Sequence, residues 1–331
     1  MIARIRHLAD KLPWGGSRSA PARAYLNGRP HQQHLSGGRP RLGLALSSGG
    51  AKGLAHIGVI QVLEENGIEI DVVAGASMGA YVGSLWAAGY SGVELEALAG
   101  EMRTKRDLLR LIDPVFPPRQ GLLRGYKVKA HLAKSLRGRR FEDLEKEFHV
   151  VATNLVTLQR RVFSEGDVAT AVHASIAVPG VCVPVEIDGE LYSDGGISEP
   201  LPVSVLRSCE VDHVIAVSAL PSPKELAACR VDYFHDEPER NLLRRLGRCV
   251  NRQFNLFAKG NMIDILRSSA YGSQTRLAHR LGADADVFLE ATLCEGRWHD
   301  YSGFERYIRL GRECAEAHIE EIRNLTLSWA A

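Results

Sequence analysis

The chain has 331 residues, of which 45% are hydrophobic and 24% are charged. This composition is typical of a globular protein and excludes disordered and collagen-like classes. No apolar stretch approaches the ~18–20 residues that a membrane-spanning helix needs, and the N-terminal residues lack the apolar core of a signal peptide. The six cysteines and twelve histidines form no CxxC or HExxH pattern, so we expect no metal, no disulfide framework and a cytoplasmic location.

The formal net charge is only +2, but the basic residues are concentrated in two segments. Residues 1–41 hold eight Lys or Arg and one acid, and residues 103–140 hold twelve Lys or Arg and two acids. Such segments are either solvated surface or contacts for an anionic surface such as a membrane, and both interpretations stay open. We expect no nucleic-acid partner, and the sequence leaves the oligomeric state open.

The first predicted elements alternate between strand and helix. Residues 1–40 form a basic segment, rich in Pro, Gly and Ser from residue 13 onward, and they indicate a flexible lead-in to one domain at 41–331. Buried strands are predicted at 42–46 and 71–74, and each is followed by a glycine-rich turn and a helix, at 54–65 and up to residue 88. This order predicts a parallel sheet with right-handed crossovers.

The later elements extend the same architecture. Further buried strands are predicted at 148–153, 183–187, 213–218 and 287–289, and one long helix is predicted at 303–325. Residues 238–270 have a helical pattern, so a helical cap is expected at about 222–275. The predicted fold class is α/β, a three-layer α/β/α sandwich with a mostly parallel central sheet.

The segment Gly75-x-Ser77-x-Gly79 has the form of a nucleophile elbow. In such an elbow a sharp strand-to-helix turn presents the serine hydroxyl at the start of a helix, and the flanking glycines leave room for the turn. A glycine-rich turn without function is the alternative, but the predicted strand and helix on either side favour the elbow. The loop at 48–53 also joins a strand to a helix, so its amide groups could form an oxyanion hole or cradle a phosphate.

Three blocks of the sequence, in order, resemble those of the patatin-like phospholipases. They are LALSSGGAKGLAHIGVIQVLEE, GASMGAYVGSLWAAGY and HASIAVPGVCVPVEIDGELYSDGGISEPLPV. The resemblance covers about residues 41–325 and implies a serine lipid acyl hydrolase, without cofactor or metal, that cleaves acyl esters of phospholipids, lysophospholipids or other acyl lipids. It implies a catalytic dyad of Ser77 and Asp194, an oxyanion hole at Gly49, Gly50 and Ala51, and the motif glycines Gly53, Gly75, Gly79, Gly195 and Gly196.

The chain departs from this family pattern at three positions. Ser48 stands where a third glycine is common, and its side chain must then point away from the oxyanion hole. Lys52 replaces the more usual arginine, which keeps the charge but not the forked geometry. Glu199 stands where asparagine is common, in the segment that we expect to hold the loop of Asp194.

A carboxylate is a weak base for a serine hydroxyl unless burial raises its pKa. Asp194 is expected at the end of a strand, partly buried, although Asp-Gly-Gly alone is also typical of a hairpin turn. The alternative enzyme is an α/β-hydrolase or acyltransferase whose base is a histidine. Five histidines are candidates for that role, none in a local motif, and we expect His56 to be structural: His56, His173, His213, His279 and His299.

Two segments have the pattern of basic amphipathic helices that can lie on an anionic membrane. They are residues 1–14 and residues 240–257, where arginines recur every four residues. The alternative for 240–257 is that its apolar face packs on the domain. A third interpretation of the whole chain is a catalytically inactive lipid-binding regulator on the same fold.

Overall fold

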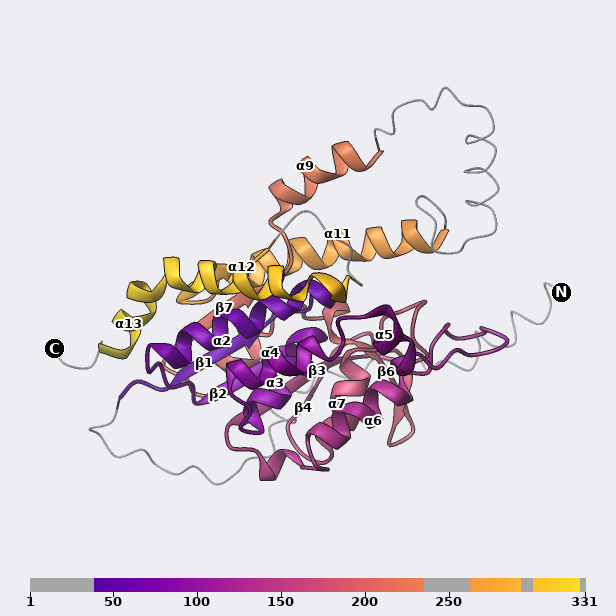
Figure 1. Cartoon of the computed structure of the whole chain (residues 1–331), viewed down its shortest axis with the longest axis horizontal. Helices are drawn as coiled ribbons and strands as arrows, with labels where there is room; N and C mark the ends of the chain where they lie inside the picture. The colour runs from indigo at the N-terminus through magenta and orange to yellow at the C-terminus, as the bar shows by residue number, and fades with distance from the viewer. Residues whose placement is uncertain (1–38, 235–261, 293–299, 328–331) are drawn as a thin grey trace, which may run out of the picture. The chain divides into compact units, whose positions relative to one another are not determined.

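The computed structural model describes residues 39–234, 262–292 and 300–327, all within one compact unit, Arg39–Ala331. At its centre is an eight-stranded sheet with the strand order β5-β6-β3-β2-β1-β7-β8, and β4 pairs with β3 (Figure 1). Strands β3, β2, β1, β7 and β8 are parallel, whereas β4 and β6 pair with β3, and β5 with β6, in antiparallel fashion. The strands are β1 (Leu42–Leu46), β2 (Val72–Ala76), β3 (Glu147–Asn154), β4 (Arg160–Phe163), β5 (Val185–Ile187), β6 (Glu190–Asp194), β7 (His213–Ser218) and β8 (Val287–Glu290).

Helices cover both faces of this sheet. Along β1, Leu42, Leu44 and Leu46 contribute to one buried cluster, and Ala45 contributes to another on the opposite face, as the alternation of side chains along a strand requires. Helices α2, α3, α7 and α12 contribute to the first cluster, and α8 and α11 to the second. The helices are α2 (Ala55–Glu65), α3 (Met78–Ala87), α4 (Gly92–Gly100), α5 (Lys105–Leu111), α6 (Tyr126–Ser135), α7 (Val168–Ser175), α8 (Val203–Arg207), α9 (Pro223–Phe234), α11 (Met262–Gly282), α12 (Phe304–Ala317) and α13 (Ile319–Leu327). The predicted three-layer α/β/α fold is therefore confirmed.

Helices α2 and α12 lie side by side in direct backbone contact (Figure 1). A Cβ atom on Gly58 of α2 would lie 1.9 Å from the carbonyl oxygen of Ile308, and one on Gly311 of α12 would lie 1.9 Å from that of Ala55. Because such distances exclude any side chain, the two helices approach more closely than larger residues would allow. The C-terminal part of the chain is thus built into the same layer as the first helix.

The predicted strands are present to within about two residues, with β5 antiparallel, but three other elements differ from the prediction. The antiparallel strands β4 and β6 were not predicted, because both are short and lie beside β3. The predicted long helix at 303–325 is wrong, because the chain forms two helices that break at His318. There the ring of His318 bonds the carbonyl of Cys314 at 2.9 Å through Nδ1, in place of the helical backbone bond.

The predicted cap and N-terminal segment lie largely outside the described residues. Of the predicted cap at about 222–275, residues 235–261 are not described; the described parts are α9 and the first residues of α11, a helix that packs against α8 and β7. Residues 1–38 also lie outside the description, so the domain boundary at residue 41 stays a prediction. Among the helices that the structure describes, none has the length and apolar character needed to cross a bilayer.

Candidate active site

Ser77 occupies the turn between β2 and α3 with backbone angles of φ 53° and ψ −120°. A positive φ is strained for a residue other than glycine, and it is the conformation expected at a nucleophile elbow. The flanking glycines make this turn possible: a Cβ atom on Gly75 would lie 2.6 Å from the amide nitrogen of Ala80, and one on Gly79 would lie 2.2 Å from the carbonyl oxygen of Leu46. The glycine spacing thus follows from the space available.

The register of β3 places Ser77 beside Asp194. Val151 pairs with Ala76, the residue before Ser77, and the next residue along β3, Ala152, pairs with Asp194 at the end of β6. The Ser77 hydroxyl donates a hydrogen bond of 2.6 Å to Oδ2 of Asp194. Two residues that lie 117 positions apart in the sequence are therefore joined through one strand between them.

The Asp194 carboxylate is almost completely shielded from water, with 3% of the residue exposed, and Ser77 is 7% exposed. Burial raises the pKa of Asp194 to about 6, even though the hydrogen bonds from Ser77 and from the Gly196 amide favour the ionised form. The Gly196 amide donates to Oδ1 at 2.7 Å, which leaves Oδ2 directed at the serine. A carboxylate of this kind is a better proton acceptor than a solvated one.

A second serine, Ser175 at the end of α7, supports the elbow. Its hydroxyl accepts a hydrogen bond of 2.8 Å from the Ser77 amide and donates one of 2.6 Å to the carbonyl of Val151. The strained backbone of Ser77 is thereby tied to β3. Sequence reasoning did not assign Ser175 this position, because it lies 98 residues from Ser77 and has no motif of its own.

The glycine loop between β1 and α2 lies against the elbow. Gly50 has φ 57° and begins a short 3-10 helix, Gly50–Leu54. The amides at the start of a helix have no partner within it, and within the described segments no acceptor binds the amides of Gly49 or Gly50. The loop is attached to the elbow where a Cβ on Gly53 would meet the Met78 side chain at 2.6 Å. Gly49, Gly50 and Ala51 precede Gly53 in this loop, and their role as oxyanion donors stays a prediction.

The three departures from the family pattern have distinct surroundings. The Ser48 amide donates to the carbonyl of Pro200 at 2.8 Å, so it is engaged, and the buried Ser48 hydroxyl has no partner among the described residues. That hydroxyl faces Gly196, because it lies 2.9 Å from where a Cβ on Gly196 would sit. Glu199 is buried and forms an ion pair with Arg160. Burial lowers the pKa of Lys52 to about 8.

Each described candidate histidine bonds a group other than the dyad. His56 is buried beside the glycine loop, where Nε2 bonds the carbonyl of Ser47 at 2.8 Å, and burial lowers its pKa to about 4. The other rings bond the Arg124 carbonyl at 3.1 Å (His173), approach Asp286 at 3.6 Å (His213) or bond Glu290 at 3.3 Å (His279), and His299 lies outside the described residues. Over residues 39–234, 262–292 and 300–327, no histidine ring bonds Ser77 or Asp194.

Comparison with known proteins places this geometry in a family. A family model described as patatin-like phospholipase matches residues 44–207. An uncharacterized NTE family protein of Mycobacterium tuberculosis is 43% identical over 181 residues, which cover 54% of this chain and 49% of that protein. Lysophospholipase NTE1 of Saccharomyces cerevisiae is 31% identical over 180 residues, which cover 53% of this chain and 10% of that protein.

A solved structure, VipD from Legionella pneumophila, is 15% identical, with a TM-score of 0.46 over 86% of this chain and 67% of that one. The chain spans about half the length of the mycobacterial relative that it matches. Residues 44–207 include both Ser77 and Asp194 together with the glycine loop. Through these residues the chain belongs to the patatin-like phospholipase family.

Proposed function

We propose that the protein hydrolyses acyl esters of lipids through a Ser77–Asp194 dyad. The observation that carries the proposal is the 2.6 Å hydrogen bond from the Ser77 hydroxyl to a buried carboxylate. Asp194 takes the hydroxyl proton while Oγ attacks the ester carbonyl carbon. The tetrahedral intermediate collapses with loss of the alcohol, to which Asp194 returns the proton, and an acyl-serine remains. Water, deprotonated by Asp194, then releases the fatty acid and restores the serine.

The glycine loop supplies the second requirement of this chemistry. As the carbonyl oxygen becomes an oxyanion, amide donors held in place by the fold stabilise it without reorganisation. The amides of Gly49, Gly50 and Ala51 are the candidates, since they begin a helix next to the elbow. The site therefore needs no metal to hold the developing charge.

An acyl lipid is the proposed substrate class, supported by the family match and by the surface beside the site. The segment between α5 and α6 exposes 95% of Phe116, with Leu109 of α5 also exposed. This segment is bonded to the loop before β5, because the Leu122 and Leu123 amides donate to the carbonyl of Val181. The same loop accepts the Asp194 amide through Ala177 at 2.9 Å.

Exposed basic side chains occur in the same stretch of the chain, from just before α5 to the start of α6: Arg103, Arg106, Arg110, Arg119, Arg124 and Lys127. Apolar and cationic groups on one surface suit an anionic lipid interface. We therefore place the contact with the lipid aggregate here. The two amphipathic segments that the sequence suggested for this contact, residues 1–14 and 240–257, lie outside the described residues.

The test is incubation of the wild-type protein and Ser77→Ala with a mixed lipid extract, followed by mass spectrometry of the products. We expect fatty acids and the matching deacylated lipids with the wild type alone, and their identity gives the head group. A serine-reactive fluorophosphonate should label the wild type at Ser77. Equal product release by both proteins, or no turnover and no labelling of the wild type, would refute the proposal.

A further inference from the structure

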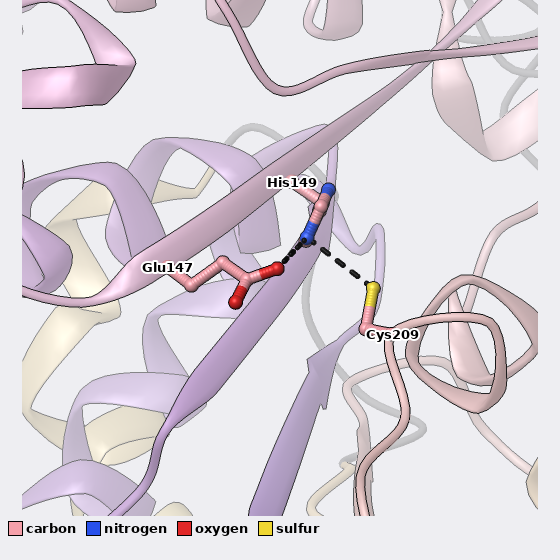
Figure 2. Close-up of side chains that lie close together, drawn as sticks. All are labelled: Glu147, His149 and Cys209. Carbon is pink, nitrogen blue, oxygen red and sulfur yellow. Dashed lines mark hydrogen bonds and ion pairs between the residues drawn. The ribbon is translucent and has the colours of Figure 1, made fainter. Parts of the chain in front are cut away.

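A second group of reactive side chains lies at the opposite end of the sheet from the dyad. Glu147 begins β3, His149 follows two residues later on the same face, and Cys209 lies just after α8. Nε2 of His149 lies 3.0 Å from Oε1 of Glu147 and 3.3 Å from Sγ of Cys209. Figure 2 shows the carboxylate and the thiol both directed at this one nitrogen, and the three atoms lie within 4.8 Å of one another.

This arrangement differs from a proton relay. In a relay the imidazole bonds the carboxylate through one nitrogen and the nucleophile through the other. Here the carboxylate and the thiol share Nε2, whereas Nδ1 is buried and has no partner among the described residues. A single proton on Nε2 cannot lie along both directions, but a cation between the three atoms would contact all of them.

Arg41, just before β1, orients two members of the group from outside. Its Nη2 bonds Oε2 of Glu147 at 2.6 Å, which leaves Oε1 free to face the histidine. Its Nη1 bonds the carbonyl oxygen of Cys209 at 2.9 Å and so fixes the backbone that carries the thiol. Groups that hold ligands in place through hydrogen bonds are the usual surroundings of protein metal sites.

We propose that Glu147, His149 and Cys209 bind one divalent transition-metal ion, with zinc as the best match and water as a fourth ligand. Carboxylate oxygen, imidazole nitrogen and thiolate sulfur are the three donor types that zinc takes in proteins. Zinc–ligand bonds of about 2.0 Å to nitrogen and oxygen and about 2.3 Å to sulfur hold tetrahedral ligands roughly 3.3–3.6 Å apart. The 3.0 and 3.3 Å separations need to widen by a few tenths of an ångström, and the carboxylate oxygen and the sulfur, which lie within 4.8 Å of each other, need to come to within about 3.6 Å.

The protonation states of the group make zinc binding dependent on pH. Burial alone would lower the pKa of His149, but its hydrogen bonds to Cys209 and Glu147 raise that pKa to about 9. In the same arrangement the Cys209 thiol can donate to the Val205 carbonyl at 3.2 Å. Zinc competes with protons for the imidazole and the thiolate, so binding strengthens as pH rises.

The proposed site is remote from the chemistry of Ser77. Glu147 pairs with Val72 at the start of β2, and Ser77 follows the other end of that strand. Five residues of strand correspond to about 16 Å. A metal here would join the start of β3 to the end of α8 and, through Arg41, to β1. Since only the folded chain assembles the three ligands, zinc should raise the free energy of unfolding.

The experiment uses full-length, tag-free protein stripped of metal and then given one equivalent of zinc or cobalt. Metal retained after gel filtration is measured by mass spectrometry, and a thiolate–cobalt absorption band reports sulfur ligation directly. Cys209→Ser and His149→Gln are the test variants. Cys314→Ser is the matched control, because Cys314 is also partly buried and bonds a nearby histidine, here through its carbonyl.

We expect the wild type and Cys314→Ser to retain one equivalent and show the thiolate–cobalt band, and both test variants to lose the two signals. The melting temperature of the wild type should rise with zinc, more at pH 8 than at pH 6. A wild type without the thiolate–cobalt band would overturn the proposal even if a variant fails to fold. Equal metal in wild type and Cys209→Ser would overturn it too. Ester hydrolysis by Ser77 is measured separately and should not change with zinc.

Discussion

The two ends of the central sheet carry opposite kinds of chemistry. At the carboxyl end of β2, Ser77 precedes the first residue of α3, where free amides favour developing negative charge. At the amino end of β3, Cys209 follows the last residues of α8, where free carbonyls favour a cation. The end with Ser77 has glycines at positions where a side chain would clash with the backbone. The other end has an oxygen, a nitrogen and a sulfur atom that lie close together. In a parallel sheet the direction of the strands thus decides which charge each end can hold.

The largest effect is expected at the carboxyl end, from Ser77→Ala. Removal of the proposed nucleophile should abolish hydrolysis of short-chain esters and labelling by a fluorophosphonate, with circular dichroism unchanged. Ser84→Ala is the matched control, because Ser84 is buried in α3, the helix that follows Ser77, and its hydroxyl donates to the Tyr81 carbonyl at 2.8 Å. Undiminished labelling of Ser77→Ala would show that Ser77 is not the nucleophile.

Asp194→Asn should reduce kcat/KM by about 10²–10⁴, the range for a lost general base. The wild-type rate should rise with pH through about 6, because Asp194 accepts a proton only when ionised and burial raises its pKa to about 6. Initial rates on a soluble ester between pH 4.5 and 8 give both quantities. A folded His56→Gln variant with the same loss would instead favour a histidine base.

Gly50→Val should lower the rate by about 10²–10³ without removing a reactive group, the loss expected for a disturbed oxyanion donor. The cause would be the φ of 57° at Gly50, which a branched residue adopts only with strain. Gly67→Val is the matched control, since Gly67 has φ 64° and open space around it at the end of α2. Both variants carry similar strain, so equal activity would show that the loop holds no oxyanion.

A smaller effect, about tenfold, is expected from Phe116→Ser on the hydrolysis of lipid in anionic vesicles. Inserting one aromatic side chain into a bilayer is worth about 1.5–3 kcal/mol, and about 1.4 kcal/mol corresponds to a factor of ten. Hydrolysis of a soluble ester should not change. Leu327→Ser, which alters an exposed apolar residue at the end of α13, should affect neither assay. If both variants hydrolyse vesicle lipid equally slowly, the contact with lipid is not located at the end of the sheet that carries the dyad.

The last effects concern stability rather than activity, and they separate the two ends of the sheet by pH. The pKa values of Asp194 and His149 are both higher in the folded protein than the ordinary values of these side chains. The folded state therefore binds these protons more tightly than the unfolded chain does, and the free energy of unfolding falls as pH rises. For Asp194, whose ordinary pKa is 3.8, the fall lies between about pH 4 and 6, and for His149 it lies between about pH 6.5 and 9. Each shift corresponds to on the order of 3 kcal/mol.

Urea unfolding of metal-stripped protein across this range should show that Asp194→Asn removes the first fall and His149→Gln the second. Asp194→Asn should therefore be more stable than the wild type at pH 8 while almost inactive. An unchanged pH profile in either variant would mean that the corresponding group is solvated.

The elbow and the dyad partner could be predicted from sequence because their constraints are local or occur in recognisable blocks. The glycines at 75 and 79 are required by backbone atoms a few ångströms away, and Asp194 is fixed by the turn that follows it. Ser175 and the Arg160–Glu199 pair escaped prediction, because only the folded sheet brings them to their partners.

The group of Glu147, His149 and Cys209 could not be predicted for the same reason, because folding brings its members together. We expected no site because the sequence has no local ligand spacing, and that expectation stays untested. Glu147 and His149 lie on one strand, and Cys209 is 60 residues from His149, so no short pattern could reveal the group. The break at His318 was missed for another reason, because a side chain replaces a backbone donor there.

The close packing of α2 on α12, at Gly58 and Gly311, determines how much of the chain must be expressed for the protein to fold. The family match ends at residue 207, yet β7 pairs along the whole of β1, and α12 lies on α2 through those glycines. A gene fragment cut after residue 207 would leave the β1 edge unpaired and open to aggregation. A folded fragment must therefore extend through Leu327, more than a hundred residues beyond the end of the family match.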